Sequence, residues 1–315
     1  MLREKKYPLR AIAKTLQRAA STISDELKRN AVHNAYDAKK AHLKSYQRRR
    51  KAKYQSMKIV QSPALRSFIE EKLLDDQSPQ AIAGRIKKKE KHLPTISKNS
   101  IYRYITSAYG GRIEAHRYVK RQRKKKRKTK LKSLDGRVFI DKRPQYINKR
   151  MRGGHAEADF VVSGRDGYGI LLGIVDRKLR TVFLELILTV SIREVHKAFR
   201  RIKKRYPEML SFTTDNDLLF KYHKKLATLL NIKIYFCNPY HSWEKGAIEN
   251  VNKYIRKDIP KSSDLSLYSK KFIAKLEAKL NRRPMKCLDY ATPAEALALF
   301  RKRKENRKNS SGRKK

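Results

Sequence analysis

Three acidic residues in the second half of this chain stand in segments where carboxylates can do chemistry. They are Asp159 in HAEADFVVS, Asp215 in SFTTDNDLLF and Glu249 in NPYHSWEKGAIEN. Carboxylate oxygens are the hard ligands that Mg²⁺ prefers, and two such ions about 3.5–4 Å apart can clamp the attacking and leaving oxygens of a phosphoryl displacement. If the three acids meet in the folded chain, they predict a divalent-cation site that acts on phosphodiesters.

The charge of the chain makes such an acidic cluster informative. The 315 residues include 80 Lys and Arg against 29 Asp and Glu, which gives a formal net charge of +51. Nucleic acid is the expected partner, an anionic membrane surface is the second candidate, and a merely solvated surface is the alternative without a partner. Metal ions would mediate between carboxylates and phosphates, which otherwise repel each other.

Cysteine usage and hydropathy exclude other classes. Cys237 and Cys287 are too few for a disulfide framework or a zinc set. The N-terminal MLREKKYPLR leads into no apolar core of a signal peptide, and the apolar stretches YGILLGIV and VFLELIL are too short to span a membrane. We therefore expect a soluble cytoplasmic protein without a membrane partner.

The acids sit in a region that alternates strand and helix patterns. Three consecutive strands are expected in HAEADFVVS, GYGILLGIVD and RTVFLELIL, and two more in SFTTD and IKIYFCN. Between and after the last two strands lie amphipathic helices, the first capped by Ser191. This order matches an α/β ribonuclease-H-like domain with a five-stranded mixed sheet. In that topology the strands of Asp159 and Asp215 are neighbours at the sheet centre, and Glu249 begins a helix that can cross back over them.

Other acids near these segments compete for the same role. Glu244 stands where a carboxylate often only offsets the exposed N–H groups of a helix start, so Glu249 is preferred. Glu157 projects to the same strand face as Asp159, so we expect it either to support the ligands from behind or to replace one of them. Asp176 is expected to be a turn acid. Each acid alone is more often structural, so the argument depends on their joint placement.

The predicted helix of Glu249 also carries candidate DNA contacts. By three-to-four spacing, Asn252, Lys253 and Arg256 share its face with Glu249. We expect these side chains, together with Lys245 just before the helix, to hold the DNA strand that is cut.

The first half reads as two helix-turn-helix modules. In LRAIAKTLQRAASTISDELKRN, the apolar residues Leu9, Ile12, Ala13 and Leu16 keep helical spacing, and Ser21 is the expected cap of a second helix. On that second helix we expect Ile23 and Leu27 to face inward and Thr22, Asp25, Lys28 and Arg29 to point outward toward DNA. The second module pairs SPQAIAGRIKK, with its Ser78 cap, and SKNSIYRYITS. In that last helix Ile101, Tyr104 and Ile105 face inward and Arg103 faces DNA. An ordinary pair of amphipathic helices is the alternative.

Two basic segments complete the predicted organisation. RYVKRQRKKKRKTKLK at 117–132 has no acidic residue and cannot build a core, and RKRKENRKNSSGRKK at the end reads as a disordered tail. The expected parts are a first helix-turn-helix region (1–58), a second (59–110), a basic linker (111–150), the catalytic core (151–300) and the tail (301–315).

Taken together, these motifs resemble the IS30 family of insertion-sequence transposases, which carry an Asp-Asp-Glu, integrase-like catalytic core. The resemblance covers nearly the whole chain, from STISDELKRN through RPQYINKRMRGGHAEADFVV, FTTDNDLLF and PYHSWEKGAIENVNKYIRKDIPK to LNRRPMKCLDYATPAEAL. The 33 residues between Asp215 and Glu249 fit as well.

The resemblance implies the chemistry of DNA transposition. Water attacks a phosphodiester at the end of the element, and the freed 3′-OH then attacks target DNA. Asp159, Asp215 and Glu249 would hold two Mg²⁺ ions, with Mn²⁺ as a substitute. The N-terminal modules would bind the terminal inverted repeats, and pairing two ends implies a homo-oligomer. The implied location is the cytoplasm of a prokaryote, on the nucleoid.

The chain departs from the family pattern at two places. Ala156 stands where the family has Trp, and the second motif has Asp217 and Leu219 where the family has Gly and Glu. Glycine there would permit a positive φ that aspartate tolerates less well. Two alternatives therefore stay open: a catalytically impaired DNA-binding protein or repressor derived from a transposase, and another metal-dependent nuclease of the same fold.

Overall fold

The computed structural model describes residues 7–31, 36–55, 57–113, 136–164, 167–239, 241–261 and 263–312. They form two compact units, the first with the helices up to Ile105 and the second with the elements from Ile140 onward. The predicted basic segment at 117–132 lies outside the described residues.

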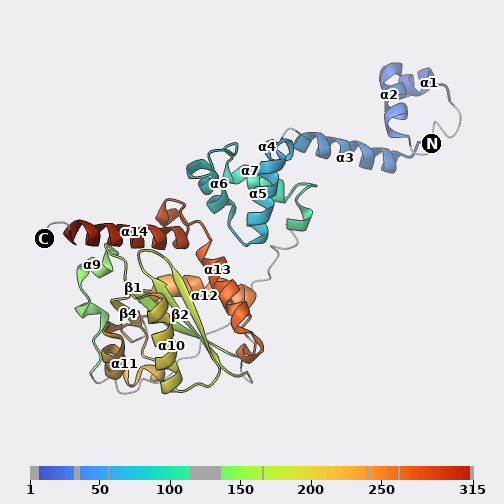
Figure 1. Ribbon diagram of the computed structural model, residues 1–315. Helices are drawn as coiled ribbons and strands as arrows, with labels where there is room; N and C mark the ends of the chain where they lie inside the picture. Colours follow the sequence, from blue (N-terminus) through green and yellow to red (C-terminus); the bar gives the residue numbers. More distant parts are fainter. Residues whose placement is uncertain are drawn as a thin grey trace. The chain divides into compact units, whose positions relative to one another are not determined.

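The first unit is helical (Figure 1). Its elements are α1 (Leu9–Thr15), α2 (Ala20–Asn30), α3 (Ala38–Gln55), α4 (Lys58–Gln61), α5 (Pro63–Leu74), α6 (Pro79–Lys88) and α7 (Lys98–Ile105). Helices α4 to α7 enclose one apolar cluster, which includes Ile101, Tyr104 and Ile105 as predicted. The Ser78 hydroxyl accepts a hydrogen bond from the Ala81 N–H at 3.2 Å and so caps α6, as expected. The predicted Ser21 cap is wrong, because α2 begins at Ala20 behind Ala19 without a side-chain cap.

The second unit is built on a five-stranded sheet in the order β3-β2-β1-β4-β5. The strands are β1 (His155–Val162), β2 (Ile170–Asp176), β3 (Val182–Ile187), β4 (Ser211–Thr214) and β5 (Lys233–Phe236). The pairs β1–β2 and β2–β3 are antiparallel, whereas β4 is parallel to both β1 and β5. This is the predicted ribonuclease-H-like mixed sheet.

Helices cover both faces of the sheet. One face packs against α10 (Ile192–Arg205) and α11 (His223–Leu230), and the other against α12 (Gly246–Asp258) and α13 (Lys270–Asn281) (Figure 1). Alternation along β1 sends Ala156 and Ala158 to the first face and Val161 to the second. Glu157 and Asp159 therefore face α12. Ser191 caps α10 by accepting from the Glu194 N–H at 3.2 Å, as predicted.

The C-terminal segment corrects a prediction. Instead of a disordered tail from 301, α14 runs from Pro293 to Gly312. Arg301 on this helix donates to Glu208 at 3.0 Å and to the Arg205 carbonyl at 2.9 Å. The prediction of a disordered tail rested on the basic composition after residue 300. The first turns of α14 are apolar, and the basic residues continue the helix that these turns begin.

Candidate active site

The sheet brings Asp159 and Asp215 together. Strands β1 and β4 run parallel with Glu157 opposite Thr213, and each aspartate follows its paired residue by two positions. The ammonium group of Lys245 joins them: Nζ lies 3.0 Å from Asp159 Oδ1 and 3.0 Å from Asp215 Oδ2. The two carboxylate oxygens can therefore be no farther apart than twice that distance.

Lys245 is buried with its charge. Its residue is 3% exposed, in the last position of the 3₁₀ turn η3 (Ser242–Lys245). Burial alone would lower the pKa of Lys245, but the carboxylates of Asp215 and Asp159 outweigh it and raise the pKa. The side chain therefore stays a cation and neutralises the pair. It does not present its charge to DNA, which differs from the DNA-contacting role predicted for it.

The carboxyl group of Asp159 is partly buried and lies near a second acid, Asp215. Burial raises the pKa of Asp159, Lys245 acts in the opposite direction, and Asp215 adds to the increase. Two carboxylates at this separation repel unless a cation lies near both. The site thus favours positive charge between Asp159 and Asp215.

Helix α12 brings further oxygens to this pair. Asn252 donates from Nδ2 to Asp159 Oδ2 at 2.8 Å. Its amide Oδ1 is buried and has no hydrogen-bond partner among the described residues. A buried amide oxygen without a donor is a fitting ligand for a hydrated hard cation.

Glu249 lies on α12 between the two residues that contact Asp159. It follows Lys245, the N-cap residue of α12, by four positions and precedes Asn252 by three, so it shares the side of the helix on which Asn252 lies. Glu249 is half-buried and makes no hydrogen bond or ion pair within the described ranges. No three His, Cys, Asp or Glu side chains of the described residues already stand in metal-ligand geometry. The structure thus links Asp159 to Asp215 through the ammonium of Lys245 and places Glu249 on the neighbouring helix.

Glu157 fixes the start of α12. It is fully buried, and its Oε2 accepts hydrogen bonds from the N–H groups of Ala247 at 2.8 Å and Ile248 at 3.0 Å. Its Oε1 pairs with Arg177 at 2.9 Å. Glu157 is therefore a positioning residue and not a metal ligand. The sequence signal was a glutamate in a buried strand, but nothing local identified its partners.

Glu244 and Asp176 also have structural roles. Glu244 Oε2 accepts from the Asn238 N–H at 2.9 Å and so ties the loop before η3. Asp176 accepts from the N–H groups of Gly154, Lys178 and Leu179, which confirms it as a turn acid. The preference for Glu249 over Glu244 agrees with this arrangement, since Glu244 has its partners within the loop.

The altered second motif is accommodated without strain. Asp217 has φ −63° and ψ 149°, so no positive φ is needed where the family has glycine. Its side chain accepts from the Leu219 N–H at 2.8 Å and caps the 3₁₀ turn η2 (Leu218–Phe220). Asn216 donates to the Cys237 carbonyl at 2.9 Å and accepts from Arg137 at 2.8 Å. The backbone strain expected at Asp217 is therefore absent.

The remaining candidate DNA contacts of α12 differ in whether their charge is free to bind a phosphate. Lys253 is exposed and has no partner in the described part of the chain. Arg256 donates to the carbonyl oxygens of Val162 at 2.8 Å and Pro260 at 3.1 Å, so its guanidinium is held within the protein. Of the four predicted contacts, Lys253 is the one whose charge is free for a phosphate.

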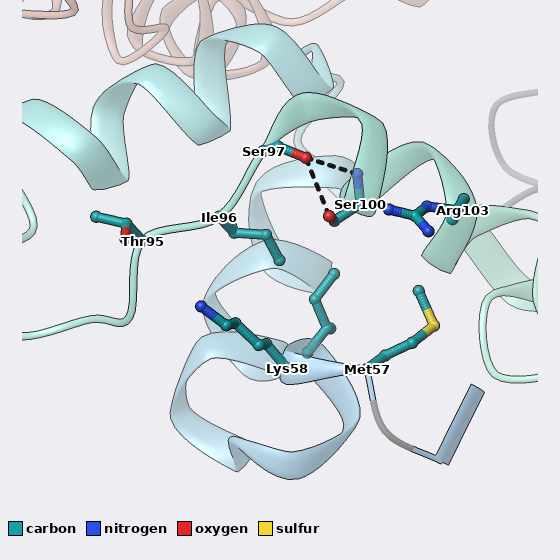
Figure 2. A pocket seen from close by; sticks show the side chains of 8 residues that line it. Met57, Lys58, Thr95, Ile96, Ser97, Ser100 and Arg103 are labelled. Atoms are coloured by element: carbon teal, nitrogen blue, oxygen red, sulfur yellow. Dashed lines mark hydrogen bonds between the residues drawn. The ribbon is translucent and has the colours of Figure 1, made fainter. Parts of the chain in front are cut away.

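In the first unit, the predicted DNA contacts are at the surface. Thr22, Lys28 and Arg29 are exposed on α2, and Arg103 is exposed on α7. Figure 2 shows a pocket of about 430 Å³ beside α7, in which Arg103 and Lys58 are lining residues. Ser97 caps α7 there by accepting from the Ser100 N–H at 3.1 Å. Among the helices that the structure describes, none is long and apolar enough to cross a bilayer.

Comparisons with known proteins agree with this architecture. A family described as a helix-turn-helix domain matches residues 1–30. The transposase for insertion sequence element IS4351 of Bacteroides fragilis is 36% identical over 299 residues, which are 91% of this chain and 88% of that protein. The transposase for IS1086 of Cupriavidus metallidurans is 30% identical over 302 residues, 92% of this chain and 88% of that one.

Two further matches complete the comparison. The transposase InsI for IS30C of Escherichia coli is 30% identical over 309 residues, 93% of this chain and 79% of that protein. Among solved structures, the HTLV-2 integrase catalytic core is 19% identical with a TM-score of 0.34, covering 44% of this chain and 92% of that one, a likeness too weak to add weight.

The helical N-terminal unit, the ribonuclease-H-like sheet and these relatives define the class of the protein: it is an insertion-sequence transposase. Within that class, the chain belongs to the IS30 family, as its motifs predict.

Proposed function

We propose that the second unit cuts DNA at the ends of an insertion sequence and joins the freed 3′ ends to target DNA, with Asp159, Asp215 and Glu249 as the catalytic carboxylates. The observation that carries the proposal is the ammonium of Lys245 between Asp159 and Asp215. Two partly exposed acids that share one buried cation in a strongly basic protein fit a site for metal ions on a phosphodiester.

Mg²⁺ is the proposed cofactor, as two ions, with Mn²⁺ able to replace it. Asp159, Asp215 and Glu249 would hold the ions, and the orphaned amide oxygen of Asn252 adds a neutral donor. When bound, the ions would activate the attacking oxygen and stabilise the leaving one. The chain's own residues orient the acids: Glu157 fixes α12, and Asn252 holds Asp159.

The first unit supplies the proposed recognition of DNA ends. Exposed Thr22, Lys28 and Arg29 on α2, and Arg103 on α7, suit major-groove and phosphate contacts by a helix-turn-helix. Lys253 on α12 would hold the strand being cut. We further propose the predicted domain boundaries, with recognition modules over 1–58 and 59–110 and a core over 151–300, assembly into a homo-oligomer that pairs two ends, and a cytoplasmic, nucleoid-associated location.

A strand-joining assay tests the proposal. The substrate is a plasmid that carries the DNA flanking the chain's own coding sequence, incubated with full-length protein, Mg²⁺ and a target plasmid. Wild type should cleave and join, and Asp159→Asn, Asp215→Asn and Glu249→Gln should each lose about a thousandfold or more. All three variants should bind the flanking DNA normally. End binding by wild type without any cleavage would favour a repressor, and cleavage without joining would favour a nuclease.

A further inference from the structure

A groove between α10 and α11 lies apart from the candidate active site. It has a volume of about 880 Å³. Helix α10 contributes Arg193, Lys197 and Arg200 to its lining. Lys225 and Leu229 of α11, together with Tyr222 just before that helix, line the other wall. None of its lining residues is acidic. The groove is therefore a cationic concavity, and its lining also includes Tyr222 and the aliphatic side chains of Ile192 and Leu229.

The cations of the groove are available to a ligand. Arg193, Arg200 and Lys225 are exposed and have no hydrogen-bond or ion-pair partner within the described residues. Lys197 pairs with Glu194 at 2.7 Å on the surface, a contact of small energetic value. Burial, and then the neighbouring charge of Lys225, lower the pKa of His196, which favours its neutral form. Three cations without a hydrogen-bond or ion-pair partner among the described residues thus line one cavity.

The spacing of these charges fits a nucleic-acid backbone. Arg193, Lys197 and Arg200 lie at positions i, i+4 and i+7 of α10, which spans about 10 Å of helix axis. Each strand of duplex DNA has one phosphate per about 3.4 Å of the DNA helix axis, so about three phosphates of one strand fall within that length. Lys225 faces the same cavity from α11 and would contact the backbone from the other wall.

Both helices of the groove start at the end of the sheet where β4 stops just before Asp215. Strand β3 runs parallel to β1, and α10 follows its C-terminal end, just as Tyr222 and α11 follow the end of β4 after Asp215. Helices α10 and α11 lie on one face of the sheet and α12 on the other (Figure 1). A duplex in the groove would thus approach the acids from the face opposite to α12.

We propose that the groove binds the phosphate backbone of a second DNA duplex, the target, while the cut end lies on the α12 side. This inference rests on the proposed function, because a strand-joining enzyme has two duplexes to place at one set of acids. It assigns Arg193, Arg200 and Lys225 to target binding.

Lysine acetylation of the full-length wild-type protein tests the groove without any need for catalysis. The probe is a duplex that lacks the element's ends, at about 0.15 M salt. We expect it to slow acetylation of Lys225 severalfold, because phosphate contacts cover the groove, while exposed Lys271 and Lys275 on α13 change little in the same molecules. Equal protection of all three lysines, or none, would overturn the groove as a DNA site.

A matched pair of variants then tests which duplex it holds. Arg193→Gln/Arg200→Gln/Lys225→Gln removes the three free charges, and Lys270→Gln/Lys271→Gln/Lys275→Gln removes three exposed charges from α13 as the control. The groove variant should lose joining to target by about tenfold or more while cleaving ends as the control does. An equal loss of end cleavage, or unchanged joining, would overturn the assignment to target DNA. A wild type that cleaves nothing would count against the proposed function, and the acetylation pattern would still decide the groove.

Discussion

The carboxylate of Glu157 accepts a hydrogen bond from the backbone N–H of Ile248 at 3.0 Å, which ties β1 to the first turn of α12 across 91 residues of sequence. The same strand carries Asp159, and the same helix carries Glu249. One fully buried side chain therefore fixes the relative position of two of the three proposed catalytic acids.

Replacing Glu157 by Gln should destabilise the protein and weaken joining. The amide cannot hold both the helix N–H groups and the buried Arg177 guanidinium, so a charge is left unpaired at a cost of about 3–5 kcal/mol. Urea denaturation measures the loss in free energy of unfolding. The joining assay, at a temperature where the variant is folded, measures the effect of the misplaced α12 on activity.

A double variant provides the control for Glu157. Glu157→Gln with Arg177→Met leaves no unpaired charge, so it should regain more than half of the lost stability. Joining should stay low, because the N–H groups of Ala247 and Ile248 still lack their carboxylate. A single variant with unfolding free energy within about 1 kcal/mol of wild type would contradict this role.

Removing the charge of Lys245 should strengthen cation binding. Its Nζ occupies the position between Asp159 and Asp215 that a metal ion would neutralise, so the two cations compete. Lys245→Met should bind Mn²⁺ about tenfold more tightly or better, as measured by electron paramagnetic resonance of the free ion. Lys275→Met, an exposed lysine on α13, should match wild type. Unchanged or weaker Mn²⁺ binding by Lys245→Met would argue that no ion binds there.

A side chain at Gly173 should displace α12. Gly173 pairs with Asp159 across β1 and β2, and an added Cβ would lie 3.3 Å from Ile248 Cδ1. Gly173→Val should therefore cost about 1–3 kcal/mol and reduce joining more than DNA binding. The control is Gly246→Ala at the start of α12, where an added Cβ meets nothing within 4 Å. Equal joining by the two variants would show that α12 does not depend on this close approach.

The stability that the Glu208–Arg301 contact gives to α14 should be lost at acid pH. Burial would raise the pKa of Glu208, but its hydrogen bond to Arg301 and the charges of Arg301 and Lys304 lower the pKa overall. A carboxylate with a lowered folded-state pKa adds stability above its unfolded value of 4.5, and that stability is lost as the pH falls through the folded value.

Glu208→Gln should remove this pH dependence. We expect a loss of about 1–2 kcal/mol at pH 7 that disappears at low pH, measured by urea denaturation at pH 7 and pH 3. A loss of the same size at both pH values would contradict the contribution of the charged pair.

The sequence predicted the fold and the proximity of Asp159 and Asp215 for identifiable reasons. Strand alternation and the order of elements place Asp159 and Asp215 on neighbouring parallel strands, and three-to-four spacing places Glu249 with Asn252. Strand alternation and helical spacing can each be seen within a short stretch of sequence, and the order of the strands and helices matches a known fold. The Ser78 and Ser191 caps were predictable for the same reason.

The roles of Lys245 and Glu157 could not be predicted, because both depend on contacts between distant segments. In the sequence Lys245 is one more cation in a basic chain. The fold brings Asp159 to it from 86 residues away, together with Asp215 from the neighbouring strand end. The α14 helix was missed because its composition resembles that of a disordered tail, whereas its contact with Glu208 is tertiary. The Ser21 cap was wrong because α2 already begins at Ala20, which places Ser21 inside the first turn.

Diffraction from crystals of the full-length protein soaked in Mn²⁺ tests the central claim most directly. Anomalous scattering locates the ion without reference to activity. The predicted result is a peak bonded to oxygens of Asp159 and Asp215, with the ammonium of Lys245 moved out of the position it holds now. A fully occupied Mn²⁺ elsewhere, with Lys245 still bridging the two aspartates, would contradict the account.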